Sequence, residues 1–138
     1  MGHVPTGPVS EEGEGAHIPR RKRRGSRTPG SRAAHRRRLG DVGEEIAARF
    51  LARRGCPILA RNVRAGRGEI DLIIRDSGVV VAVEVKMGAT PMEQFTDDKI
   101  AAVRAAMRRL QPAPQRLDLV TVNPHAGGVT VRWYRGAG

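Results

Sequence analysis

Apolar residues recur at helical spacing in two parts of the chain. In residues 40–56 the predicted inward positions are Val42, Ile46, Ala47, Phe50 and Leu51. Asp41 suits the N-cap of this helix, and Gly55 suits the left-handed position after its last turn. A second helix is predicted in residues 95–110, with Thr96 as its N-cap. Its predicted inward positions are Ile100, Val103, Met107 and Leu110.

Short aliphatic runs bounded by turn residues predict five strands. They cover residues 57–63, the two arms of a hairpin within 68–86, residues 116–122 and residues 129–134. The passage from the second hairpin arm through the second helix to residue 116 is long enough for a right-handed parallel crossover. The order α-β-β-β-α-β-β therefore predicts an α/β fold, with a mixed sheet flanked by helices.

The predicted hairpin sorts its side chains onto two faces. Asp76-Ser77 is expected to form the turn, with Arg75 opposite Gly78. One face then carries only aliphatic residues: Ile70, Leu72, Ile74, Val79, Val81, Val83 and Val85. The other face carries Glu69, Asp71, Glu84 and Lys86, together with Ile73, Val80 and Ala82. The charged residues of the two strands are thus expected on one face.

This polar face predicts a site for a divalent cation. In the expected register Glu69 is opposite Glu84, and Asp71 is diagonal to Glu84 at roughly 7–8 Å between backbones. Two such carboxylates can hold Mg²⁺ or Mn²⁺, which accept one or two carboxylates together with water and substrate oxygens. Lys86 projects from the same face, where it could neutralise a phosphate oxygen or orient or deprotonate an attacking water. The alternative is a half-exposed sheet with a Glu84–Lys86 ion pair worth about 0–1 kcal/mol.

Two adjacent glutamates in the first predicted helix face different ways. At about 100° per residue, Glu44 lies beside Leu51 at the border of the apolar stripe, whereas Glu45 points to the opposite side. Only Glu44 can therefore face inward along the edge of the core.

Charge is distributed unevenly along the chain, whose net charge is +11. Residues 1–38 contain ten of the 25 Lys and Arg residues and almost no aliphatic residues, which predicts a disordered basic tail before a folded domain at 39–138. The positive surplus favours a polyanionic partner, meaning nucleic acid or an anionic surface. The tail could bind phosphates or could simply be solvated.

No stretch of the sequence suits a membrane or an oxidising compartment. Nothing approaches the roughly 18 apolar residues of a membrane span, and no apolar segment typical of a signal peptide follows the basic residues. Cys56 is the only cysteine, which excludes an internal disulfide. A cytoplasmic protein is expected, with no membrane partner.

The segment "GDVGEEIAARFLARRGCPILARNVRAGRGEIDLIIRDSGVVVAVEVK" resembles the YraN family of bacterial proteins. The similarity runs from about Leu39 to Val122 and is strongest in "GEE-x-x-A", "N-x-R", "GEIDLI" and "VEVK". The family is similar to the restriction-endonuclease-like, or PD-(D/E)xK, nuclease superfamily. The resemblance implies a three-layer restriction-endonuclease-like core. One departure is Gly88, at a position where the family commonly has an arginine.

The resemblance also implies roles for four residues. Asp71 and Glu84 would be metal ligands, Lys86 the residue that positions water, and Glu44 a carboxylate contributed by the helix. The expected function is hydrolysis of phosphodiester bonds in DNA, branched or damaged, with Mg²⁺ or Mn²⁺ in a recombination or repair setting. The alternative is a non-catalytic nucleic-acid-binding module with a nuclease fold.

The expected substrate contacts are basic side chains. The candidate nucleic-acid-binding residues are Arg64, Arg67, Lys99, Arg104 and Arg108. DNA is favoured over RNA, although the sequence does not separate the two. Symmetric cutting of a four-way junction would require a homodimer, and a repair protein is a further candidate partner.

Overall fold

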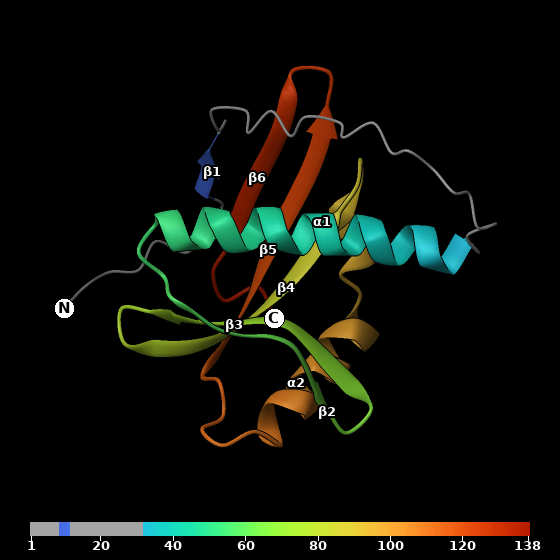
Figure 1. Cartoon of the computed structure of the whole chain (residues 1–138). Coiled ribbons are helices and arrows are strands. Elements are labelled where there is room, and N and C mark those ends of the chain that lie inside the picture. Colours follow the sequence, from blue (N-terminus) through green and yellow to red (C-terminus); the bar gives the residue numbers. More distant parts are fainter. Residues whose placement is uncertain (1–8, 12–31) are drawn as a thin grey trace.

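A mixed six-stranded sheet forms the centre of the protein in the computed structural model, which describes residues 9–11 and 32–138 (Figure 1). The elements are β1 (Val9–Glu11), α1 (Arg32–Arg53), β2 (Ile58–Ala65), β3 (Gly68–Asp76), β4 (Val79–Met87), the 3-10 helix η1 (Pro91–Gln94), α2 (Asp97–Arg108), β5 (Arg116–His125) and β6 (Gly128–Tyr134). The strand order is β1-β6-β5-β4-β3-β2. β4 and β5 are parallel, and the other neighbours are antiparallel. The predicted α/β class, element order and parallel crossover are confirmed for residues 32–138.

The two helices cover opposite faces of the sheet. α1 lies across β4 and β5, whereas α2 packs against β3 and β2 (Figure 1). The core under α1 includes Ala47, Leu51, Leu72, Val83 and Trp133. The core under α2 includes Ile70, Ile73, Val103, Met107 and Leu117. Ile70 thus belongs to the α2 side rather than to the aliphatic face predicted for the hairpin. Among the helices of the described residues, none is both long enough and apolar enough to cross a membrane.

α1 begins well before the predicted N-cap. Asp41 lies inside the helix, and residues 32–38 of the predicted tail belong to it. Arg and Ala are good helix formers, and extending an existing helix is easier than starting one, so the cap preference of about 1 kcal/mol at Asp41 does not stop it. Val42 is 39% exposed, because the buried stripe is centred on Ala47 and Leu51.

The predicted tail was also expected to be disordered, and the structure describes only part of it. Val9–Glu11 pair with β6 as an added strand. Residues 1–8 and 12–31 lie outside the described residues.

The hairpin turn is Ser77-Gly78 rather than Asp76-Ser77. Asp76 pairs with Val79, and the φ angles of Ser77 and Gly78 are 49° and 84°, as a type I′ turn requires. The predicted register is therefore wrong. Most side chains of the hairpin still lie on the predicted face of the sheet. The residue opposite each β3 position is two places further along β4 than predicted, and side chains alternate between faces with a period of two.

A partly buried ion-pair network holds Asp76 in β3. Arg116 Nη2 donates to Asp76 Oδ2 over 2.7 Å, and Arg135 Nε donates to the same oxygen over 3.2 Å. Arg116 also donates to the fully buried Asp118, which accepts a further hydrogen bond from Trp133 Nε1. These contacts join β3, β5 and β6 at the N-terminal end of β5. They explain why Asp76 ends a strand instead of opening a turn.

Candidate active site

The hydrogen-bonded ladder between β3 and β4 opens at Asp71. The last regular pair is Leu72 with Val83. Beyond it, Asp71 Oδ2 accepts a hydrogen bond from the backbone N–H of Val85 over 2.8 Å. Continued by one residue, the observed register would place Asp71 rather than Glu69 across from Glu84, so the predicted opposition of Glu69 and Glu84 is wrong. A carboxylate therefore occupies the position where the next ladder bond would form.

Glu84 and Lys86 form an ion pair that is largely buried. Lys86 Nζ lies 3.4 Å from Glu84 Oε2, and the two side chains are 14% and 6% exposed. Because so little of either side chain is exposed, this pair differs from the exposed ion pair considered as an alternative in the sequence analysis. Removing both charged groups from water is costly. Burial, followed by the charge of Asp71, raises the pKa of Glu84 from 4.5 to about 8. Lys86 acts in the opposite direction on the same carboxyl group.

α1 contributes Glu44 to the same site. Burial, followed by repulsion from Asp71, raises the pKa of Glu44 from 4.5 to about 7. The Glu44 and Asp71 carboxyl groups are also within hydrogen-bonding reach of each other when one carries a proton. Glu45, the next residue, turns away and forms ion pairs with Arg49 and Arg61. The prediction that Glu44 rather than Glu45 faces inward agrees with this geometry.

Asn62 is a member of this cluster that sequence reasoning missed. With its amide nitrogen turned toward α1, it donates to Glu44 Oε2 over 2.9 Å. In the β2–β3 register Asn62 lies across from Asp71, between the pairs Arg61–Leu72 and Val63–Ile70. Its φ is 51°, a left-handed conformation that Asn tolerates better than most residues. An asparagine inside an aliphatic strand was the available signal, because Asn is depleted in strands.

The donor set fits a hard divalent cation held by two carboxylates. Asp71 and Glu84 come from facing strands, and their mutual repulsion would be relieved by a cation as well as by a proton. Mg²⁺ usually retains several waters and binds proteins through one or two carboxylates. Within residues 9–11 and 32–138, no group of three or more His, Cys, Asp or Glu side chains is arranged to hold a metal.

Gly43 sets how closely α1 approaches this site. A Cβ atom at Gly43 would lie 3.0 Å from Cβ and 3.2 Å from Sδ of Met87 in β4. The Met87 Cβ is fixed to the backbone and cannot rotate away, so a side chain at Gly43 would move α1 outward. Glu44 follows Gly43 directly, which makes this close contact part of how the glutamate reaches Asp71.

We expect Gly43→Ala to destabilise the protein. Overpacking against Met87 should cost about 1–3 kcal/mol, and the higher helix propensity of alanine offsets part of that cost. Gly40→Ala is the matched control, because a Cβ there meets nothing within 4 Å. It should raise the free energy of unfolding by about 0.5–1 kcal/mol. Urea unfolding of the two variants measures both effects. Equal stabilisation by both alanines would show that α1 can move away from β4 without cost.

Gly88, the departure from the family pattern, has a φ of 145°. Side chains rarely adopt this conformation, so the arginine common in the family would be strained here without a local change in the backbone. The Gly88 N–H donates to the carbonyl of Val122 over 3.0 Å, which continues the pairing of β4 with β5. The departure therefore coincides with a positive φ two residues after Lys86.

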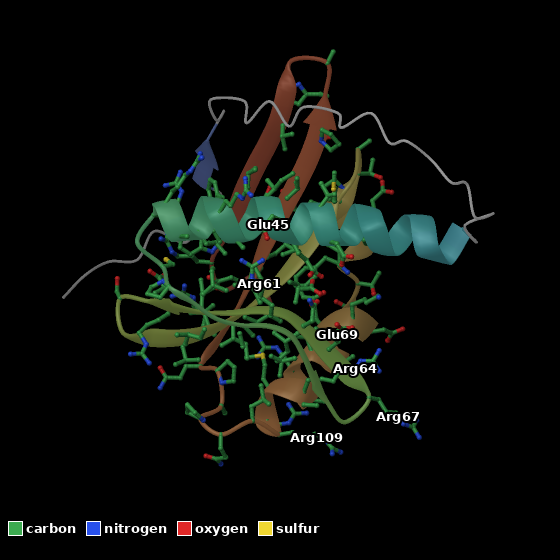
Figure 2. All side chains as sticks on the ribbon, in the orientation of Figure 1. Glu45, Arg61, Arg64, Arg67, Glu69 and Arg109 are labelled. Atoms are coloured by element: carbon green, nitrogen blue, oxygen red, sulfur yellow. The ribbon has the colours of Figure 1, made fainter. Side chains whose placement is uncertain are left out.

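The five predicted nucleic-acid-binding residues are exposed but do not form one surface. Arg64 is on β2 and Arg67 in the turn before β3, and both lie near Arg109 at the end of α2 (Figure 2). Arg104 and Arg108 are about 100–140° away from Arg109 around the axis of α2. Lys99 lies in the first turn of that helix. Arg64 and Arg67 are thus grouped with Arg109, whereas Arg104 and Arg108, one turn apart, lie together on another side of α2.

The protein is an α/β domain with a cluster of carboxylates and one lysine at the point where β3 and β4 separate. The chain belongs to UPF0102, the YraN family, because the model described as "Uncharacterised protein family UPF0102" matches residues 43–122. A UPF0102 protein of Symbiobacterium thermophilum is 44% identical over 103 residues, covering 67% of this chain and 87% of the relative. Another from Nocardioides sp. is 39% identical over 123 residues, covering 80% and 99%. The residues that the family model matches, 43–122, span the positions of Glu44, Asp71, Glu84 and Lys86.

Proposed function

We propose that this protein is a metal-dependent nuclease that hydrolyses phosphodiester bonds in DNA. The observation that carries the proposal is the position of Asp71, whose carboxylate lies between those of Glu44 and Glu84 where the β3–β4 ladder opens. Lys86 adds a buried ammonium beside Glu84. Three carboxyl groups close enough to raise the pKa values of two of them are costly to fold, so their presence favours a role in chemistry rather than in stability.

The residues suit distinct roles in phosphodiester hydrolysis. Asp71 and Glu84 would hold Mg²⁺ or Mn²⁺, which when bound supplies electrostatic stabilisation of charge on the phosphate. Lys86 would neutralise a phosphate oxygen or orient the attacking water, because its ammonium is compact and held by Glu84. Glu44, whose pKa is about 7, can take up or release a proton near neutral pH.

A nucleic acid is the proposed substrate class because the chain is strongly basic, and DNA is the member of that class that we propose. Its net charge of +11 favours a polyanion, and only two Phe, one Trp and one Tyr are available for stacking on bases. Recognition of backbone and shape is therefore favoured over recognition of sequence. Branched or damaged DNA in a recombination or repair setting fits this mode. Symmetric cutting of a junction would add a homodimer, and a repair protein is a candidate partner.

The test is a panel of duplex, single-stranded, flap and four-way DNA incubated with the full chain. We expect nicking of at least one substrate with Mg²⁺ or Mn²⁺ and none after chelation by EDTA. Matching RNA molecules in competition separate the two substrate classes. Cleavage of no substrate in either metal, or equal cleavage in EDTA, would overturn the proposal.

The second candidate is a nucleic-acid-binding module that does not cut. It is favoured by the way the site residues satisfy one another: Asn62 with Glu44, Val85 N–H with Asp71, and Lys86 with Glu84. Calorimetric titration separates the candidates. Salt-dependent DNA binding without any Mg²⁺ or Mn²⁺ binding would favour the module, whereas metal binding lost in Glu84→Gln would favour the nuclease.

A further inference from the structure

Three arginines from different elements gather at one end of the β2–β3 hairpin. Arg64 comes from β2, Arg67 from the turn, and Arg109 from the residue that caps the C-terminus of α2 (Figure 2). All three are exposed, and no ion pair within the described part of the chain involves them. We refer to Arg64, Arg67 and Arg109 as the hairpin patch.

Close packing fixes the hairpin patch in place. A Cβ atom at Gly66 would lie 2.8 Å from Nε of Arg109, and one at Gly68 would lie 2.7 Å from the carbonyl oxygen of Ala102 in α2. The hairpin turn therefore rests directly on α2 at two points. Two of the arginines thus come from the strand and the turn, and the third comes from the end of the helix that packs against that turn.

The charge of the hairpin patch is only partly compensated. Glu69 is the acidic residue across from Arg64 in the β2–β3 register, and it is also exposed (Figure 2). Three arginines and one glutamate leave a positive surface. Arg61, further along β2, differs because it is already paired with Glu45. The surface near the turn is thus the part of this hairpin available to an anionic ligand.

The hairpin patch lies at a fixed distance from the candidate active site. Arg64 is across from Glu69, which is two residues from Asp71, so the backbone separation along the strand is about 7 Å. Arg67 is four residues from Asp71, or at most about 13 Å. Successive nucleotides of a DNA strand rise about 3.4 Å along the helix axis. The span therefore corresponds to about two to four nucleotides.

We propose that the hairpin patch binds backbone phosphates of the substrate about two to four nucleotides from the bond held at Asp71, on one side of that bond only. This inference rests on the proposed function. Arginine suits the role because its guanidinium forms bidentate hydrogen bonds with phosphate. Contacts of this kind set the position of the nucleic acid without reading its sequence.

Binding tests the inference separately from cleavage. In an Asp71→Asn background, Arg67→Gln/Arg109→Gln should weaken DNA binding by about tenfold or more. It should also reduce the slope of log affinity against log salt by about 1.4–1.8, the value for two lost phosphate contacts. Arg75→Gln/Arg132→Gln is the matched control, because these exposed arginines lie at the far end of β3 and on β6. Equal losses in the two pairs, or an unchanged slope, would overturn the inference.

Substrate truncation tests the one-sided placement. The experiment compares the rates at which wild type and the Arg67→Gln/Arg109→Gln variant cleave duplexes that are shortened from one side or the other of the cleaved bond. On one side only, the rate difference between the two proteins should disappear when fewer than about two nucleotides remain. A difference that persists at every length would overturn the placement. Absence of cleavage by wild type would contradict the proposed function, while the salt slopes would still decide whether the hairpin patch binds DNA.

Discussion

Asp71→Asn protein is expected to cleave DNA about 10²- to 10³-fold more slowly than wild type, or not measurably. The substitution removes the charge that lies between Glu44 and Glu84 while keeping the shape of the side chain. The asparagine oxygen can still accept the hydrogen bond from Val85 N–H, so the fold should persist. Glu84→Gln should cause a loss of similar size. Single-turnover cleavage with Mg²⁺ or Mn²⁺ measures both.

Glu45→Gln is the control for these variants. It removes the same charge from the residue adjacent to Glu44, but Glu45 faces Arg49 and Arg61 instead of the site. Its cleavage rate should stay within about twofold of wild type, because an exposed ion pair contributes at most about 1 kcal/mol. Cleavage at the wild-type rate in both Asp71→Asn and Glu84→Gln would show that this site does not catalyse the reaction.

Stability without divalent cations is expected to fall as pH rises from about 5 to above 8. The native pKa values of Glu44 and Glu84 are about 7 and about 8, against 4.5 ordinarily. The native state therefore holds these protons over a pH range in which the unfolded chain has lost them, and the free energy of unfolding decreases with pH. Glu84 alone should account for roughly 2–4 kcal/mol. Urea unfolding across this range measures the change.

Mg²⁺ or Mn²⁺ should restore part of this stability, and more at pH 8 than at pH 5.5. A cation competes with protons for the same carboxylates, so its affinity rises as they ionise. Asp71→Asn should flatten the pH profile because it removes a charge that raises both pKa values. A flat wild-type profile would contradict the raised pKa values. A melting temperature that neither metal changes at pH 8 would contradict the cation site.

The sequence predicted the features that depend on local pattern. Helical spacing identified Glu44 as the inward glutamate, and Thr96 caps α2 as expected, with its Oγ1 accepting from the N–H of Lys99. The left-handed Gly55 follows the end of α1. Alternation along the hairpin sorted most residues correctly. These features follow from φ, ψ periodicity and capping, which involve only a few neighbouring residues.

The features that were missed depend on contacts between distant residues. The turn moved to Ser77-Gly78 because Arg116 and Arg135 bind Asp76 from other strands. Asn62 reaches Glu44 because the backbone of β2 is left-handed at this residue and because α1 packs nearby. Gly43 matters because Met87 lies against it. No periodicity in the sequence encodes these three contacts.

β2 has a consequence for self-association, because it is the last strand of the sheet. Its register shifts between Ile58 and Ala60, its backbone turns left-handed at Asn62, and it exposes Arg61 and Arg64. Such an edge resists pairing with a second strand, because its N–H and C=O groups do not form a continuous row and its charges repel an identical copy. Concentrated solutions should therefore not grow sheets through β2. A homodimer would have to form through another surface, leaving this side of the domain open to solvent.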